Sequence, residues 1–161
     1  MFFGTDDVNT QTVEQRIPTA LGIVANWAAI SIDIETNPAN DNRIFKLGAV
    51  RSDTGAVLSL ATDHMKVDDV VRRVDAATQG ARLLVGHNLR RHDLPHLQQQ
   101  YPGLGLLTLP LLDTLELSAF AFPTNPYHRL VKGYKILSDS RNDPLKDARL
   151  TLDLLGDEIC A

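Results

Sequence analysis

Residues 31–36 read Ser-Ile-Asp-Ile-Glu-Thr, which places two carboxylates directly after an apolar, β-branched run. Such a run is typical of a buried central strand, expected here over residues 28–34. Successive strand residues face opposite sides of a sheet, so Asp33 and Glu35 should share one face while Ile34 enters the core. Two acids on a buried face cost desolvation and repel each other, and a bound divalent cation would offset both costs. The alternative is a strand that simply ends in a polar loop.

The composition indicates a single globular domain. The chain has 161 residues, of which 43% are hydrophobic, and its formal net charge is −4. That size permits a sizeable core, and the charge shows no overall basic character, although an acidic metal site would itself lower the net charge. The single cysteine, Cys160, excludes an intramolecular disulfide framework. No signal-peptide pattern follows Met1 and no apolar run reaches transmembrane length, so a cytoplasmic location and no membrane partner are expected.

The rest of the chain predicts a hairpin followed by alternating strands and helices. The turn signal Asp53-Thr54-Gly55 joins the hairpin strands, and Asp143 followed by Pro144 marks the start of the last helix. Strands are expected over 43–50, 56–61, 82–86 and 109–113, and helices over 67–77, 91–100, 115–121, from near Tyr127, and from 144 onward. This order favours an α/β fold with a mixed sheet. Residues 1–26 form an N-terminal leader or helical extension, and residues 27–161 form the domain.

Two further acids occupy unusual positions. Asp93 lies near the start of a helix that follows a buried strand, where capping and the helix dipole are the ordinary explanation. The main apolar stripe of the last helix consists of Leu145, Ala148, Leu152, Leu155 and Ile159. Asp147 shares helical spacing with Leu150 and Leu154 beside this stripe, so its carboxylate should face the sheet. A carboxylate in that position needs a metal or a distant cation as its partner.

The ordered set of these motifs resembles the DEDD superfamily of 3′–5′ exonucleases. The motifs are Asp33-Ile34-Glu35-Thr36, then His87-Asn88 followed by Asp93, then Asp147-Ala148-Arg149 in the terminal helix. The similarity extends over about residues 28–155, nearly the whole chain. It implies a ribonuclease H-like fold, with a central mixed five-stranded sheet flanked by helices. It also implies hydrolysis of phosphodiester bonds at nucleic-acid 3′ ends, with single-stranded DNA as the expected substrate.

The resemblance implies that Asp33, Glu35, Asp93 and Asp147 hold two divalent ions, Mg²⁺ or Mn²⁺. Two ions roughly 3.5–4 Å apart stabilise charge on the phosphoryl and leaving oxygens and lower the pKa of the attacking water. Mg²⁺ takes hard oxygen ligands, so carboxylates and the substrate phosphate suffice. Within the family pattern, Asp33 would bridge both ions, with Glu35 and Asp147 on the ion that activates water. Asp93 would serve the ion at the leaving group.

The chain departs from the family at the general base. One branch of the family has a histidine five residues before the last aspartate, a position held here by Asn142, and another has a tyrosine where this chain has Asp143. Asparagine can orient a water but cannot accept its proton near neutral pH. Three interpretations stay open: the metal alone activates the water, another group such as His128 or Asp143 replaces the base, or the domain binds nucleic acid without cutting it. Retention of all four acids argues against the third.

Five further residues are candidates for contacts with nucleic acid: Thr36, His87, Asn88, Arg90 and Arg91. Thr36 follows the acidic pair, where members of the family contact the terminal nucleotide, and a plain turn role is the alternative. His87 and Asn88 could equally satisfy backbone groups at a strand end. Arg90 and Arg91 suit phosphates, although a solvated face is the commoner meaning of such charges.

Three functions therefore follow from the sequence. The first is an exonuclease, the second a non-catalytic nucleic-acid-binding or assembly module on the same fold, and the third an endonuclease. Residues 142–150 also resemble exonuclease domains fused to RecQ-type helicases, so a helicase or another nucleic-acid-processing protein is the expected partner. The choice between DNA and RNA depends on a contact to the 2′-hydroxyl, which the sequence does not locate.

Overall fold

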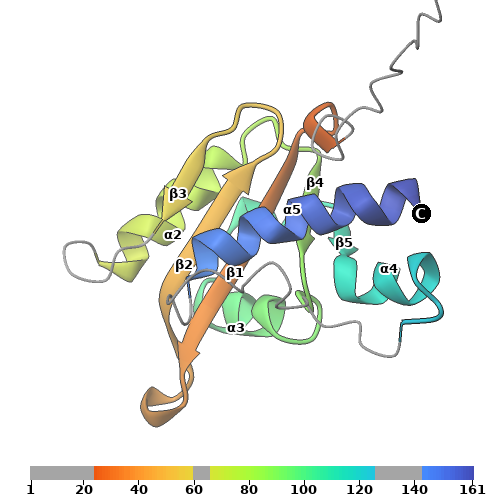
Figure 1. The fold of residues 1–161 in the computed structure, drawn as a ribbon. Helices are drawn as coiled ribbons and strands as arrows, with labels where there is room; N and C mark the ends of the chain where they lie inside the picture. Colours follow the sequence, from red (N-terminus) through yellow and green to blue (C-terminus); the bar gives the residue numbers. More distant parts are fainter. Residues whose placement is uncertain (1–23, 60–65, 126–142) are drawn as a thin grey trace, which may run out of the picture.

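A computed structural model of the chain describes residues 24–59, 66–125 and 143–161. These residues form one mixed β-sheet with helices on both faces (Figure 1). The elements are β1 (Ala29–Asn37), η1 (Pro38–Asn40), β2 (Arg43–Arg51), β3 (Val57–Ser59), α2 (Val67–Ala77), β4 (Leu83–Gly86), α3 (Asp93–Gln100), η2 (Gly105–Thr108), β5 (Leu111–Asp113), α4 (Thr114–Ala121) and α5 (Pro144–Cys160). The structure confirms the expected α/β class, with a five-stranded mixed sheet flanked by helices as in the ribonuclease H-like fold. The helix expected from near Tyr127 lies outside the described residues.

β1 is the central strand of the sheet, whose order is β3-β2-β1-β4-β5. It pairs antiparallel with β2, placing Asp33 opposite Gly48, and parallel with β4, placing Ser31 opposite Val85. β4 in turn pairs parallel with β5. The carboxyl ends of β1, β4 and β5 therefore meet at one edge, which is where ligands bind in sheets of this kind.

The alternation along β1 divides the core between two faces. Ile30, Ile32 and Ile34 are at most 3% exposed and pack on the face covered by α2 and α3. Asp33 and Glu35 point to the other face, where α5 crosses β1 and β2 (Figure 1). A fully buried isoleucine contributes about 1.5–3 kcal/mol relative to an exposed one, so the three isoleucines fix the register of β1 and the direction of both acids.

α5 begins as the sequence predicts. The Asp143 carboxylate accepts hydrogen bonds from the backbone N–H groups of Leu145 and Lys146, at 3.1 and 3.3 Å, and Pro144 occupies the first helical position. The first turn of α5 lies directly against Gly48 of β2. A Cβ atom at Gly48 would lie 2.3 Å from the Leu145 nitrogen and 2.4 Å from the Pro144 carbonyl carbon. Only glycine permits this approach.

Several boundaries differ from the expected ones. β1 continues to Asn37, three residues beyond the expected end, because β2 pairs with it as far as Arg43. α3 begins at Asp93 rather than at Arg91. The sequence also places Ile159 in the buried stripe of α5, and the structure leaves it 37% exposed. The last turns of α5 pack on α4 instead of the sheet, so Glu158 takes the buried position.

Glu158 is an acid buried between two helices. Its side chain is 6% exposed, and its Oε1 atom accepts a hydrogen bond from the Ser118 hydroxyl of α4. Burial, together with the nearby charges of Asp113 and Asp157, raises the pKa of Glu158 to about 7, although the hydrogen bond from the Ser118 hydroxyl acts in the opposite direction. The folded state therefore holds this proton more tightly than the unfolded chain does.

This proton predicts a pH dependence of stability. Because the pKa of Glu158 is higher in the folded state, its contribution is complete below pH 4.5 and is lost as the pH rises through about 7. The difference amounts to at most about 3 kcal/mol. Glu158→Gln, which stays neutral, should remove this fall, so its stability relative to the native chain should increase between pH 5 and 8 in urea unfolding. Glu116→Gln, on the exposed surface of α4, is the control. If the free energies of unfolding of Glu158→Gln and the native chain differed by the same amount at every pH, the prediction would be contradicted.

The close approach at Gly48 predicts a steric effect. Gly48→Ala should lower the free energy of unfolding by about 1–3 kcal/mol, because the added methyl group meets the backbone of α5 rather than a movable side chain. Gly103→Ala is the matched control, since a Cβ atom there meets no other atom within 4 Å. Equal urea midpoints for the two variants would show that α5 does not depend on this contact.

Candidate metal centre

Three carboxylates meet at the carboxyl end of β1. Asp33, Glu35 and Asp147 each offer one oxygen, and these oxygens all lie within 4.8 Å of one another. Asp33 and Glu35 come from the same face of β1, and Asp147 comes from the first turn of α5, which Gly48 allows to lie close to the sheet. All three side chains are half-buried. The structure therefore brings together three of the four acids named in the sequence analysis.

The chemistry of this donor set fits a divalent cation. Three like charges at such separations repel one another by about 1–4 kcal/mol for each pair, at dielectric constants between those of water and a protein surface. Carboxylate oxygens are hard ligands of the kind that Mg²⁺ and Mn²⁺ prefer. A cation bound among them would convert the repulsion into attraction. The cluster can therefore hold a metal ion.

Asp93 lies apart from the three clustered acids. It is 3% exposed, and its Oδ1 atom accepts a hydrogen bond of 3.0 Å from the backbone N–H of Ile34. β4 pairs with β1 only as far as Ser31, so the carboxylate takes the place of a neighbouring strand at this point. Burial raises the pKa of Asp93, whereas its contacts with His92 and the Ile34 N–H lower it. Asp93 thus holds the backbone that joins Asp33 to Glu35.

His87 is oriented by a buried hydroxyl. Its Nδ1 atom lies 2.9 Å from the Thr114 Oγ1 atom, and this hydroxyl donates its only proton to the Gly86 carbonyl at 3.3 Å. This hydroxyl orients the imidazole ring at the end of β4, whichever ring nitrogen carries the proton. Burial lowers the pKa of His87, while the charges of Asp113 and Asp147 raise it. The charge of Asp147 thus acts on His87 at this edge of the sheet.

Asp113 organises the loop after β4, a role that the sequence analysis did not assign. Its carboxylate accepts backbone hydrogen bonds from Asn88 at 2.8 Å, Arg90 at 3.0 Å and Leu115 at 3.0 Å. These contacts hold Asn88 at a positive φ of 63°. Asn88 takes part in this contact through its backbone N–H. The signal for Asp113 was present, because it is an acid that ends an apolar strand, as Asp33 is.

The remaining candidates are spread along the same edge. Thr36 is half-buried beside a bulge in the β1–β2 pairing. Arg90 and Arg91 are exposed, and the Arg90 Nε atom lies 3.4 Å from the Glu116 carboxylate. Asp143, one of the two alternative bases, caps α5. His128 and Asn142 lie outside the described residues.

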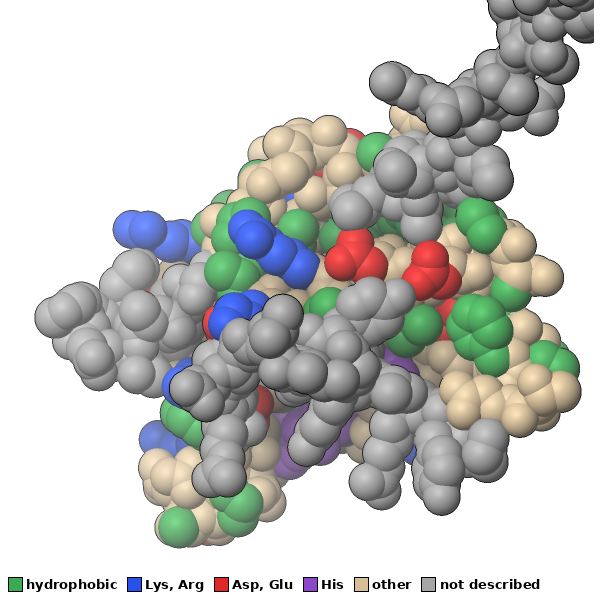
Figure 2. All heavy atoms as spheres, in the orientation of Figure 1, with side chains coloured by type: hydrophobic (Ala, Val, Ile, Leu, Met, Phe, Trp, Pro, Cys, Tyr) green, Lys and Arg blue, Asp and Glu red, His purple; other side chains and the backbone are tan. Residues whose placement is uncertain are grey.

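The charged side chains of the α5 face are unevenly distributed. Figure 2 shows Lys and Arg side chains over the N-terminal half of α5 and the neighbouring β2, and Asp and Glu side chains farther along the helix. The basic side chains therefore gather at the end of α5 that carries Asp147. Within the described residues, no helix combines the length and the apolar character that crossing a membrane requires.

Comparison with known proteins supports the fold. No family model and no curated protein sequence matches this chain. Among solved structures, the chain is similar to the family B DNA polymerase from the hyperthermophilic archaeon Pyrobaculum calidifontis, with a TM-score of 0.51 and 17% sequence identity. The similarity covers 78% of this chain and 24% of the polymerase chain. The chain thus spans about a quarter of that polymerase, and at this identity the likeness shows a shared fold.

Proposed function

We propose that this domain is a metal-dependent 3′–5′ exonuclease that hydrolyses phosphodiester bonds at nucleic-acid 3′ ends, with single-stranded DNA as its substrate. The observation that carries the proposal is the convergence of Asp33, Glu35 and Asp147 within 4.8 Å at the carboxyl end of the central strand. The fold shared with part of a DNA polymerase supports nucleic acid as the substrate class.

The proposed roles follow from the placement of the side chains. Asp33, Glu35 and Asp147 would hold two divalent ions, Mg²⁺ or Mn²⁺, and Asp93 lies outside this cluster. Bound in this way, the ions would polarise the phosphoryl oxygens and lower the pKa of the attacking water. Asp93 acts as a positioning residue, because its hydrogen bond to Ile34 fixes the backbone between the two acids of β1.

The chain's other groups would position the strand and the water. His87 would contact a water or a sugar hydroxyl at this edge of the sheet, because an imidazole nitrogen can form a hydrogen bond with either. The exposed Arg90 and Arg91 contact phosphates in this proposal, and Thr36 contacts the terminal nucleotide. We also propose a cytoplasmic location and, as partner, a helicase or another nucleic-acid-processing protein.

The second candidate function is a nucleic-acid-binding module without catalysis. The observation that favours it is the use of Asp143 as a helix cap, because two backbone N–H groups already bind the carboxylate that would have to accept the proton of the water. A domain without a general base would lose about 10²–10⁴-fold in rate. It would still bind a strand through the same edge of the sheet.

Degradation of a 5′-labelled single strand tests the exonuclease. We expect a stepwise ladder with Mg²⁺ or Mn²⁺ and none with EDTA, because the carboxylates need the cation to bind the phosphate. Asp33→Asn should lower the rate by at least about 100-fold. The matched control is Asp157→Asn, an exposed acid of the same helix as Asp147 and about 15 Å farther along its axis.

The products separate the candidate functions. Internal fragments in place of a ladder would indicate an endonuclease, and binding without any cleavage would leave the binding module. A matching RNA strand in the same assay identifies the preferred sugar. Equal rates for Asp33→Asn and Asp157→Asn would contradict the assigned centre.

Thermal unfolding with and without metal tests the centre independently of activity. Mn²⁺ or Mg²⁺ at 100 times its dissociation constant should stabilise the native chain by about 2.7 kcal/mol. Asp33→Asn removes one of three repelling charges, so without metal it should be more stable than the native chain by about 1 kcal/mol. The increase in stability that the metal gives Asp33→Asn should be much smaller than the increase that it gives the native chain. A metal-induced gain in Asp33→Asn equal to that of the native chain would show that the ion binds elsewhere.

A further inference from the structure

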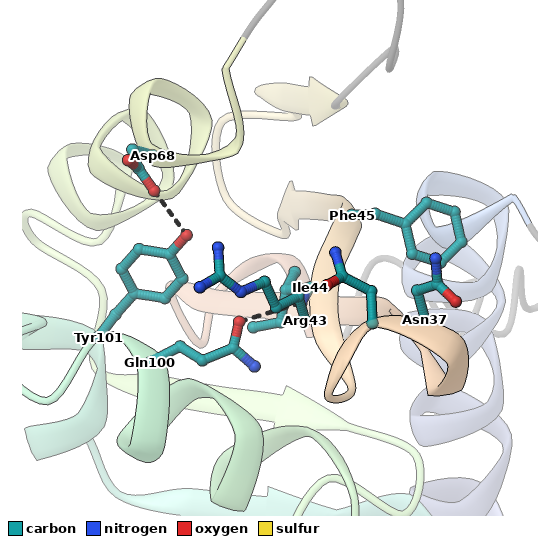
Figure 3. Close-up of a pocket in the computed structure, with 8 residues that line it drawn as sticks. Asn37, Arg43, Ile44, Phe45, Asp68, Gln100 and Tyr101 are labelled. Carbon is teal, nitrogen blue, oxygen red and sulfur yellow. Dashed lines mark hydrogen bonds between the residues drawn. The ribbon is translucent and has the colours of Figure 1, made fainter.

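A pocket of about 540 Å³ opens where β1 passes into β2. Its walls come from the β1–β2 hairpin, the first turn of α2 and the end of α3, and its largest side chains are Arg43, Phe45 and Tyr101 (Figure 3). Asn37 also lines it and lies two residues after Glu35 on β1. Asn37 therefore connects the pocket to the strand that carries the two acids.

A bulge in β2 lies opposite the segment of β1 between Glu35 and Thr36, and its extra residue lines the pocket. Glu35 pairs with Lys46 and Thr36 pairs with Ile44, so Phe45 is the extra residue between the two pairs. The Lys46 ammonium lies 5.7 Å from the centre of the Phe45 ring. A cation and an aromatic ring thus lead from the position opposite Glu35 into the pocket.

Arg43 supplies an exposed positive charge inside the pocket. Within the part of the chain that the structure describes, no carboxylate lies within ion-pair distance of its guanidinium. Figure 3 shows the Arg43 side chain directed toward Tyr101. Burial and the neighbouring Asp68 raise the pKa of Tyr101, the charge of Arg43 acts to lower it, and the resulting pKa is about 12. This influence agrees with the closeness seen in the figure.

Hydrogen bonds fix the other polar side chains that line the pocket, and they place an acid at one end of it. Gln100 accepts a hydrogen bond from the Ile44 N–H at 3.0 Å and donates one to the Asn42 carbonyl at 3.1 Å, which ties α3 to the hairpin. The Tyr101 hydroxyl donates to the Asp68 carboxylate at 2.8 Å. The acid at this end disfavours a phosphate there, so a phosphate is favoured at Arg43 and an uncharged ring is favoured at Tyr101.

We propose that this pocket binds a nucleotide of the single strand that lies 5′ of the terminal nucleotide, with its phosphate at Arg43 and its base stacked on Tyr101. An arginine beside a phosphate and an aromatic side chain beneath a base are the two contacts that bind single strands without reading their sequence. This inference rests on the proposed function, because the strand that fills the pocket is the one whose 3′ end lies at Asp33 and Glu35.

Fluorescence anisotropy of a 5′-labelled thymidine hexanucleotide with phosphorothioate linkages, in Mg²⁺, tests the pocket without requiring cleavage. Arg43→Ala should weaken binding by about fivefold or more and reduce the slope of log affinity against log salt by about 0.7. Arg43→Lys keeps the charge and should retain most of the affinity. Arg82→Ala is the matched control, since Arg82 is an exposed arginine just before β4, at the opposite end of the sheet.

Tyr101 gives a second pair of variants. Tyr101→Leu keeps an apolar side chain but removes the ring, and it should weaken binding of the hexanucleotide by about fivefold or more. Tyr101→Phe loses only the hydroxyl that donates to Asp68, so it should bind as the native chain does. Thymidine 5′-monophosphate, which occupies the carboxylate centre alone, should bind equally well to the native chain and to Arg43→Ala.

Four outcomes would overturn the proposal. The first is an equal loss of hexanucleotide affinity in Arg43→Ala and Arg82→Ala, and the second is an equal affinity of Tyr101→Leu and Tyr101→Phe. The third is no binding of the hexanucleotide by the native chain, and the fourth is a loss of monophosphate binding in Arg43→Ala. The last would show a site for free nucleotide in place of the strand. Binding that depends on Arg43 without any cleavage would overturn the exonuclease and retain the pocket. Cleavage with unchanged binding by Arg43→Ala would retain the exonuclease and overturn the pocket.

Discussion

The contact between Gly48 and the first turn of α5 is the constraint on which the candidate site depends. Asp33 and Asp147 come from distant parts of the chain, and they meet because no side chain at Gly48 separates β2 from Pro144 and Leu145. The Asp143 cap fixes the point at which the helix starts, and therefore which residue of its first turn faces Asp33. Backbone packing, rather than any attraction among the acids, brings the three carboxylates together.

Buried carboxylates also accept hydrogen bonds from backbone N–H groups at the edge where the strands of the sheet end. β4 stops at Gly86 and β5 at Asp113, so backbone N–H groups beyond them lack a strand partner. Asp93 accepts from Ile34, and Asp113 accepts from Asn88 and Arg90. An unpaired buried N–H costs about 1–3 kcal/mol, so these acids offset a cost that the short strands create. The same edge thus contains acids that stabilise the backbone and a cluster of acids that could bind a cation.

Local rules predicted the parts of this arrangement that depend on periodicity. Alternation along β1 gave the shared face of Asp33 and Glu35, and helical spacing placed Asp147 toward the sheet. The partner of Asp93, the three hydrogen bonds of Asp113 and the need for glycine at position 48 were not predictable, because each depends on a contact between elements far apart in the sequence. Ile159 was mispredicted for a related reason, since helical spacing does not tell where α5 leaves the sheet.

An ion bound at this site would couple metal binding to folding. The proposed ligands come from β1 and from α5, so an ion bound among them would join the centre of the sheet to the helix that covers it. Without the ion, repulsion among Asp33, Glu35 and Asp147 acts against the same packing that Gly48 permits. Binding energy at such a site appears as folding energy, because the ligands are not assembled in the unfolded chain. The first turn of α5 is therefore the element whose stability should respond most strongly to the cation.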